Sequence, residues 1–142
     1  MKNLEIFICE GSGKEKLYIS FRNGHKTIID IDKILYCEAD GNYTSVVSEE
    51  SIRNEICRSL CKLEELLKHH DFLRIHNSYM VNLGNVKSFY RDRKKWFVIV
   101  ADQNLPVSRR YNDIIPVLID FGIKETKNND RLINSLTGYT VK

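Results

Sequence analysis

The chain has 142 residues, of which 42% are hydrophobic and 29% are charged, and its formal net charge at pH 7 is +3. These values fit one globular domain with a single core, and no apolar run is long enough to cross a bilayer. Residues 1–10 contain too short an apolar stretch for a signal peptide and lack a small-residue cleavage site. We therefore expect a cytoplasmic protein without a membrane partner.

The charges are unevenly distributed along the chain. Residues 1–73 carry 10 Lys and Arg against 13 Asp and Glu, whereas residues 74–142 carry 12 against 6. The C-terminal half is therefore the half that attracts a polyanion. A net charge this small does not separate a nucleic-acid-binding protein from a neutral scaffold with one basic face.

In chain order, the sequence predicts a leading strand and a flexible joint over residues 1–14, followed by a domain made mostly of strands. The joint is the Gly-Ser-Gly segment before Lys14. Asn23-Gly24 predicts a type I′ hairpin between the first two strands of the domain. β-Rich segments bounded by turn residues predict strands at 17–21, 26–30, 34–39, 43–48, 52–57, 73–76, 79–81, 86–90, 96–100 and 104–107.

The first of two predicted helices follows Ser59, which is a suitable N-cap. Its apolar stripe consists of leucines spaced at the helical period, with charged residues on the other faces. This helix does not resemble a DNA-recognition helix, because its cations Lys62 and Lys68 alternate with Glu64 and Glu65. If the protein binds DNA, loops must read it.

The second predicted helix covers residues 114–121. With Asp113 as its N-cap, Pro116 falls in the first turn, where proline is tolerated, and Gly122 ends the helix. This start leaves Arg109 and the residues after it on a loop. Residues 123–142 are polar and lack clear periodicity, so we expect a loosely held tail.

The four cysteines, at positions 9, 37, 57 and 61, form no CxxC pair. Their simplest interpretation is as reduced, small apolar side chains. A metal site that combines them with His69 or His70 is the alternative, although the spacings match no common zinc pattern. We expect no metal and no cofactor.

The sequence contains none of the GxSxG, HExxH, P-loop or GxGxxG motifs. Its carboxylates are scattered, and Ser78 next to His76 is not a nucleophile–base pair, because neighbouring side chains on a strand point to opposite faces. We expect no enzymatic activity.

Several polar residues that follow predicted strands have side chains that can bind nucleic acid. Asn77 carries an amide that can bond adenine on two edges, and Arg109 carries the planar fork that fits guanine. Each has a structural alternative, since Asn77 can form a turn and Arg109 can be a solvated surface charge. Further candidates of the same kind are Asn42, Tyr43 and Thr44 in one loop, Arg74 and His76 before Asn77, Arg110, and Lys94 and Lys95 at a hairpin tip.

From Ile31 to Arg110 the chain resembles the LytTR DNA-binding domain of bacterial transcription regulators. The resemblance is carried by Asp32-Lys-Ile-Leu-Tyr-Cys-Glu-Ala-Asp-Gly-Asn-Tyr-Thr44, the 60–67 helix, Phe72-Leu-Arg-Ile-His-Asn-Ser-Tyr-Met-Val-Asn82 and Leu105-Pro-Val-Ser-Arg-Arg110. With flanking strands it covers residues 15–122. It implies a mainly β fold with short α-helices, built as an elongated stack of small antiparallel sheets.

The resemblance also implies a function. Family members bind double-stranded promoter DNA, commonly as pairs on direct repeats, by inserting loops into successive grooves. It implies that Asn77 contacts a base or the backbone, that Arg109 is the major-groove arginine, and that a third reading position lies within residues 41–44, at Tyr43 or Thr44.

Members of the family often carry a receiver domain before this module. About fourteen residues precede it here, too few for a receiver. A stand-alone regulator, a partner of an upstream sensor or receiver protein of a two-component system, and a fragment of a longer protein all remain open. Two other classes remain open: a protein-interaction module with an incidental basic face, and a single-stranded RNA binder that uses exposed aromatic residues.

Overall fold

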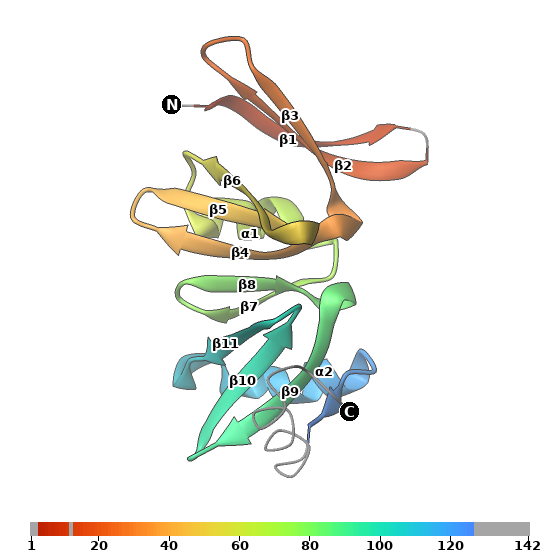
Figure 1. Ribbon diagram of the computed structural model, residues 1–142, viewed down its shortest axis with the longest axis vertical. Coiled ribbons are helices and arrows are strands. Elements are labelled where there is room, and N and C mark those ends of the chain that lie inside the picture. The colour runs from red at the N-terminus through yellow and green to blue at the C-terminus, as the bar shows by residue number, and fades with distance from the viewer. Residues whose placement is uncertain (1–2, 12, 127–142) are drawn as a thin grey trace.

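The computed structural model describes residues 3–11 and 13–126. Within them the strands form three small sheets that are stacked along the long axis of the molecule (Figure 1). The fold is therefore mostly strands with two short helices, as the sequence predicts. We call the three sheets the N-terminal, central and C-terminal sheets.

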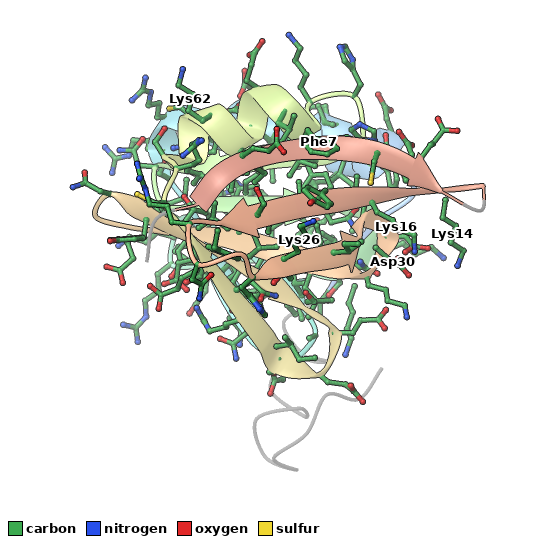
Figure 2. All side chains as sticks on the ribbon, turned by 90° about the horizontal axis from the view of Figure 1, so that it is seen from above. Phe7, Lys14, Lys16, Lys26, Asp30 and Lys62 are labelled. Atoms are coloured by element: carbon green, nitrogen blue, oxygen red, sulfur yellow. The ribbon has the colours of Figure 1, made fainter. Side chains whose placement is uncertain are left out.

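The N-terminal sheet has the strand order β1-β2-β3 and is antiparallel throughout. Its strands are β1 (Asn3–Gly11), β2 (Lys14–Phe21) and β3 (Lys26–Asp30). Seen along the stack, its outer face is open to solvent, with Lys16 and Asp30 side by side on neighbouring strands (Figure 2). The Lys16 Nζ to Asp30 Oδ1 distance is 2.8 Å.

The central sheet is antiparallel and has the order β6-β5-β4-β8-β7. Its strands are β4 (Ile34–Asp40), β5 (Tyr43–Ser48), β6 (Ile52–Ile56), β7 (Phe72–His76) and β8 (Tyr79–Asn82). Short 3₁₀ segments lie beside these strands: η1 (Ile31–Lys33), η2 (Glu49–Ser51) and η3 (Leu83–Asn85).

The C-terminal sheet has the order β11-β10-β9-β12. Its strands are β9 (Val86–Asp92), β10 (Lys95–Val100), β11 (Gln103–Val107) and the short β12 (Lys124–Glu125), which is the only parallel partner in the sheet. A 3₁₀ segment, η4 (Arg109–Ile114), follows β11 and continues into helix α2 (Ile115–Asp120).

The central sheet is buried on both faces, because cores lie above and below it. Successive side chains of a strand point to opposite faces, so neighbouring residues belong to different cores. One core, which helix α1 (Leu60–Leu67) completes, lies against the N-terminal sheet, and the other, completed by α2, lies against the C-terminal sheet. The residue pairs divided in this way are Cys37 and Tyr36, Val46 and Val47, and Met80 and Val81.

Helix α1 begins where the sequence predicts. The Ser59 hydroxyl accepts a hydrogen bond from the backbone N–H of Lys62 at 3.3 Å, which satisfies one of the free donors of the first turn. Leu60, Leu63 and Leu67 are buried. None of the helices in residues 3–11 and 13–126 has the length and apolar character needed to cross a membrane.

Two local predictions differ from the structure at the start of the chain. Residues 1–14 were expected to be a leading strand and a flexible joint before the domain, but β1 pairs with β2 from Asn3 to Gly11, so this strand is part of the N-terminal sheet. Asn23-Gly24 was expected to form a type I′ turn, which needs positive φ at both central residues. Only Gly24 is left-handed there, with φ of +88°, and its N–H bonds the Phe21 carbonyl.

The predicted tail is partly ordered. Ile123 is buried in the second core, β12 pairs with β9, and the Thr126 N–H donates to the Phe89 carbonyl at 2.7 Å. Residues 123–126 are therefore packed against the C-terminal sheet. The rest of the predicted tail lies outside the described residues.

Candidate nucleic-acid interface

Loops from two sheets meet along one edge of the stack, on the left in Figure 1. Backbone hydrogen bonds hold them together. The Ala39 N–H donates to the Ser78 carbonyl at 2.9 Å, which joins the β4–β5 turn to the β7–β8 turn. The Ser108 N–H donates to the Ile75 carbonyl at 3.0 Å, which joins the start of η4 to β7. The edge therefore presents three predicted reading loops as one ordered row.

Asn77 lies at the tip of the β7–β8 turn, and its side chain is exposed. Beside it, the His76 Nδ1 accepts a hydrogen bond from the Ser78 N–H at 3.0 Å, and the His76 ring packs against Tyr79 at a centroid distance of 5.5 Å. This imidazole therefore holds the turn with one nitrogen. The free Asn77 amide is the group at this tip that is available to a base edge.

Arg74 lies on β7 close to the turn that carries Asn77, but its guanidinium is already bonded within the protein. Its Nε donates to the His76 carbonyl at 2.8 Å and its Nη2 to the Asn77 carbonyl at 2.6 Å. Its Nη1 donates to Glu64 Oε1 at 2.9 Å and lies 3.8 Å from the Cys61 sulfur. The prediction that Arg74 contacts DNA directly does not fit this geometry, because the guanidinium is directed into the protein.

The β4–β5 turn presents Asn42 and Tyr43 to solvent, but not Thr44. Thr44 is fully buried, and its hydroxyl donates to the Arg58 carbonyl at 2.8 Å. The prediction that Thr44 reads a base therefore does not fit this structure. The reason is that β5 is covered on both faces from Thr44 to Ser48, so that only Tyr43, its first residue, is exposed.

Arg109 and Arg110 occupy the first turn of η4 and are both exposed. The sequence places them on a loop before the second helix, but the helical conformation begins earlier than expected, at Arg109. The Tyr111 N–H donates to the Ser108 carbonyl at 2.8 Å, and the Arg110 guanidinium lies 5.8 Å from the centre of the Tyr111 ring. Pro116 still falls in the first turn of α2, as predicted.

Lys94 and Lys95 lie at the β9–β10 hairpin tip, and both are exposed. Trp96 pairs with Val107, so this tip is at the same end of the C-terminal sheet as the junction between β11 and η4. The turn is tight, with positive φ at both Arg93 and Lys94. Two lysines are thus exposed at the same end of the C-terminal sheet as the Arg109 segment.

An acidic residue beneath the loops is neutralised by the protein itself. Glu38 Oε1 accepts hydrogen bonds from both terminal nitrogens of Arg53 at 3.2 Å, and Arg53 Nη2 also lies 3.3 Å from the Tyr36 hydroxyl. The Tyr79 hydroxyl lies 3.5 Å from Glu38 Oε2, and burial together with this carboxylate raises the pKa of Tyr79. Because Arg53 offsets the negative charge of Glu38, a DNA phosphate at this edge would be repelled less.

Asn82 is buried, and its amide donates to the carbonyls of Ile31 and Ile34 at 3.2 and 2.8 Å, which makes it a structural residue. The sequence interpretation missed Glu64 as a partner of Arg74, and nothing in the pattern of the 60–67 helix indicates that contact. Among the described residues no group of three or more His, Cys, Asp or Glu is placed to hold a metal ion.

Comparison with known proteins identifies the family. Residues 24–115 match the family described as the LytTr DNA-binding domain. The chain belongs to this family. That is a family of DNA-binding domains of transcription regulators, and the matched residues include the three loops described above.

Two relatives illustrate the family. The chain is 32% identical over 90 residues to the CO-responsive transcriptional regulator RcoM of Rhodospirillum rubrum; the match covers 63% of this chain and 34% of that protein, about a third of its length. The fold is similar to the LytTr DNA-binding domain of a putative methyl-accepting/DNA response regulator from Bacillus cereus. That match has a TM-score of 0.60 and 23% identity, and it covers 80% of this chain and 95% of the other.

Proposed function

We propose that this LytTR domain binds double-stranded promoter DNA sequence-specifically, with its edge loops entering the grooves. The observation that carries the proposal is that an exposed amide, Asn77, and an exposed guanidinium, Arg109, extend from neighbouring ordered turns. These are the side chains suited to adenine and guanine edges. Asn42 and Tyr43 provide the third contact, from the β4–β5 turn.

The remaining cations of the edge are assigned to the phosphate backbone. Arg110, next to Arg109, and Lys94 and Lys95, at the β9–β10 hairpin tip, are exposed. Phosphate contacts fix the register of a protein on the duplex and carry no sequence information of their own. Arg74 and His76 act within the protein, on the turn that holds Asn77.

The domain is further proposed to act in pairs on direct repeats, with a separate sensor or receiver protein supplying the signal. No helix among the described residues has the length of a coiled-coil seam. Pairing is therefore expected on DNA through tandem sites rather than through a stable dimer in solution. Sedimentation that gives a tight dimer without DNA would contradict this part of the proposal.

Selection from a random duplex library tests the proposal. The unmodified protein should enrich one sequence, and its affinity for that duplex should fall steeply as salt rises, because neutralising phosphates releases counterions. Equal binding to a scrambled duplex and to heparin would favour a protein-interaction module. Tighter binding to single-stranded RNA than to the selected duplex would favour the RNA-binding alternative.

A further inference from the structure

The guanidinium of Arg74 makes a set of contacts that a surface arginine does not need. Two of its nitrogens bond two successive carbonyls, those of His76 and Asn77, at 2.8 and 2.6 Å. Its third nitrogen bonds Glu64 of helix α1 at 2.9 Å. The Arg74 side chain is only 11% exposed, whereas that of Glu64 is 45% exposed. The fork therefore bridges a helix to the last residue of β7 and the first residue of the β7–β8 turn.

The backbone that Arg74 bonds is irregular, because the pairing of β7 with β8 shifts between Arg74 and His76. Arg74 pairs with Met80 and His76 with Tyr79, so Ile75 is left out of the pairing as in a β-bulge. Bulges redirect side chains and leave ladder groups unpaired. The Ile75 carbonyl accepts from Ser108, the residue before Arg109. The bulged segment that Arg74 holds thus adjoins both reading loops.

We propose that Arg74 is a positioning residue: together with Glu64, it fixes the turn that presents Asn77, so that helix α1 sets the presentation of a DNA-reading side chain. This inference rests on the proposed function, because it assigns Asn77 a reading role. It differs from the simpler view that Arg74 binds a phosphate. A phosphate would have to displace the Glu64 carboxylate or the two carbonyls, and most of the guanidinium is already covered.

A matched pair of variants on α1 tests the role of Glu64. Glu64→Ala and Glu65→Ala each remove one negative charge from the same helix, but Glu65 bonds only Lys68 on the surface. We expect Glu64→Ala to weaken binding to the selected duplex by up to about tenfold, because the turn that presents Asn77 is then less well ordered before it meets DNA. Glu65→Ala should change it less than about twofold. If lost negative charge were all that mattered, both variants would bind DNA slightly more tightly, and that result would overturn the inference.

Arg74→Lys separates positioning from phosphate binding, because lysine keeps the charge and loses the planar fork. Positioning predicts that Arg74→Lys loses affinity for the selected duplex about as much as Asn77→Ala, with unchanged binding to a scrambled duplex. A phosphate contact predicts nearly normal binding by the lysine variant. Circular dichroism and thermal unfolding must first show that both variants fold.

The double variant Arg74→Lys/Asn77→Ala, together with the two single variants, forms a double-mutant cycle. If Arg74 acts through Asn77, the double variant binds the selected duplex like Asn77→Ala alone, since coupled residues are not additive. Losses that multiply would overturn the inference and leave the proposed function intact. An Asn77→Ala protein with full sequence preference would instead overturn the reading role of Asn77, and the inference with it.

A spectroscopic measurement without DNA gives an independent readout. The amide resonances of Asn77 and Ser78 should shift in both Arg74→Lys and Glu64→Ala. In Arg74→Lys, the carbonyls of the same two peptide groups lose the guanidinium that bonds them. In Glu64→Ala, that guanidinium loses its partner on α1. The two amide resonances should stay in place in Glu65→Ala. Unchanged resonances in the first two variants would show that the turn does not depend on the bridge.

Discussion

Asn77 and Arg109 are exposed for different structural reasons. Asn77 is at the tip of a hairpin turn whose carbonyls are bonded by Arg74, and Arg109 is in the first turn of a 3₁₀ segment that is closed by the bond between Tyr111 and Ser108. Both side chains extend from backbone that is already ordered. Little conformational entropy is then lost when they meet DNA, which favours specific binding.

Arg109→Ala should relax the preference at one base position of the selected site. A bidentate contact with guanine contributes about 1–3 kcal/mol of discrimination, which is a factor of roughly 5 to 150. Affinity for a scrambled duplex should fall much less. Repeating the selection with the variant measures this directly. A folded variant that selects the original sequence unchanged would remove Arg109 from the list of readers.

Lys94→Ala and Lys95→Ala should weaken DNA binding without changing the preferred sequence, unlike Arg109→Ala. Their ammonium groups are exposed at a hairpin tip and suit phosphate rather than a base edge. Each change should weaken all duplexes alike and reduce the salt slope of binding by about one unit per lost contact. Titrations at several salt concentrations give this slope. A loss confined to the selected duplex would mean that the lysine reads sequence.

Thr44→Val should affect stability and leave DNA preference unchanged. The side chain keeps its shape but no longer donates to the buried bond with the Arg58 carbonyl, and an unsatisfied polar group costs about 1–3 kcal/mol. Urea denaturation measures this loss. Asn42→Ala, in the exposed turn two residues earlier, is the matched control and should weaken DNA binding with little change in stability. A Thr44→Val protein of normal stability and altered preference would reverse this assignment.

At the scale of elements, the burial of the central sheet on both faces shields its middle strand, β4, from solvent and from reagents. Cys37 lies on β4 between β5 and β8 and is fully buried, whereas Cys61 on α1 is exposed. Burial raises the pKa of the Cys37 thiol to about 12. Because the thiolate is the reactive form, the Cys37 thiol should remain inert at any pH well below that value.

Alkylation with iodoacetamide at pH 8 tests this difference. The native protein should be modified at Cys61 and spared at Cys37, and unfolding in urea should make both react. Peptide mass spectrometry distinguishes the two sites. Modification of Cys37 at the rate of Cys61 in the native protein would mean that the central sheet opens far more readily than its packing indicates.

The sequence predicts most elements because their signals are local. The strands follow from β-rich segments between turn residues, and helix α1 follows from Ser59 and its leucine stripe. The turn at Asn23 was misassigned because the Asn23 side chain accepts from the His25 N–H and Gly24 alone takes the left-handed conformation. Strand β12 could not be foreseen, since its two residues gain their conformation from pairing with β9.

The candidate site was predicted in part for the same reason. Exposed Asn77 and Arg109 follow strands whose ends the sequence marks. Thr44 was misjudged because a register uncertainty of one residue moves a side chain from the surface to the core. The bond between Arg74 and Glu64 joins a strand to a helix, and no local pattern encodes such a contact.

At the scale of the whole molecule, stacking three sheets along one axis places their turns in a row. The β4–β5 turn, the β7–β8 turn and the segment that begins at Arg109 follow one another down one edge (Figure 1). An elongated row of loops can contact a duplex at several points along its length. The outer face of the N-terminal sheet and the exposed side of α2, with Val117, Ile119 and Phe121, lie away from those loops.

Mapping amide chemical shifts during titration with the selected duplex tests the central claim most directly. We expect the largest changes at residues 41–43, 77–78, 93–95 and 109–111, and almost none at Phe7, Ile28 or Ile119. Raising the salt concentration should reverse these changes together. Changes centred on α2 or on the outer face of the N-terminal sheet, with the edge loops unaffected, would contradict the proposed interface.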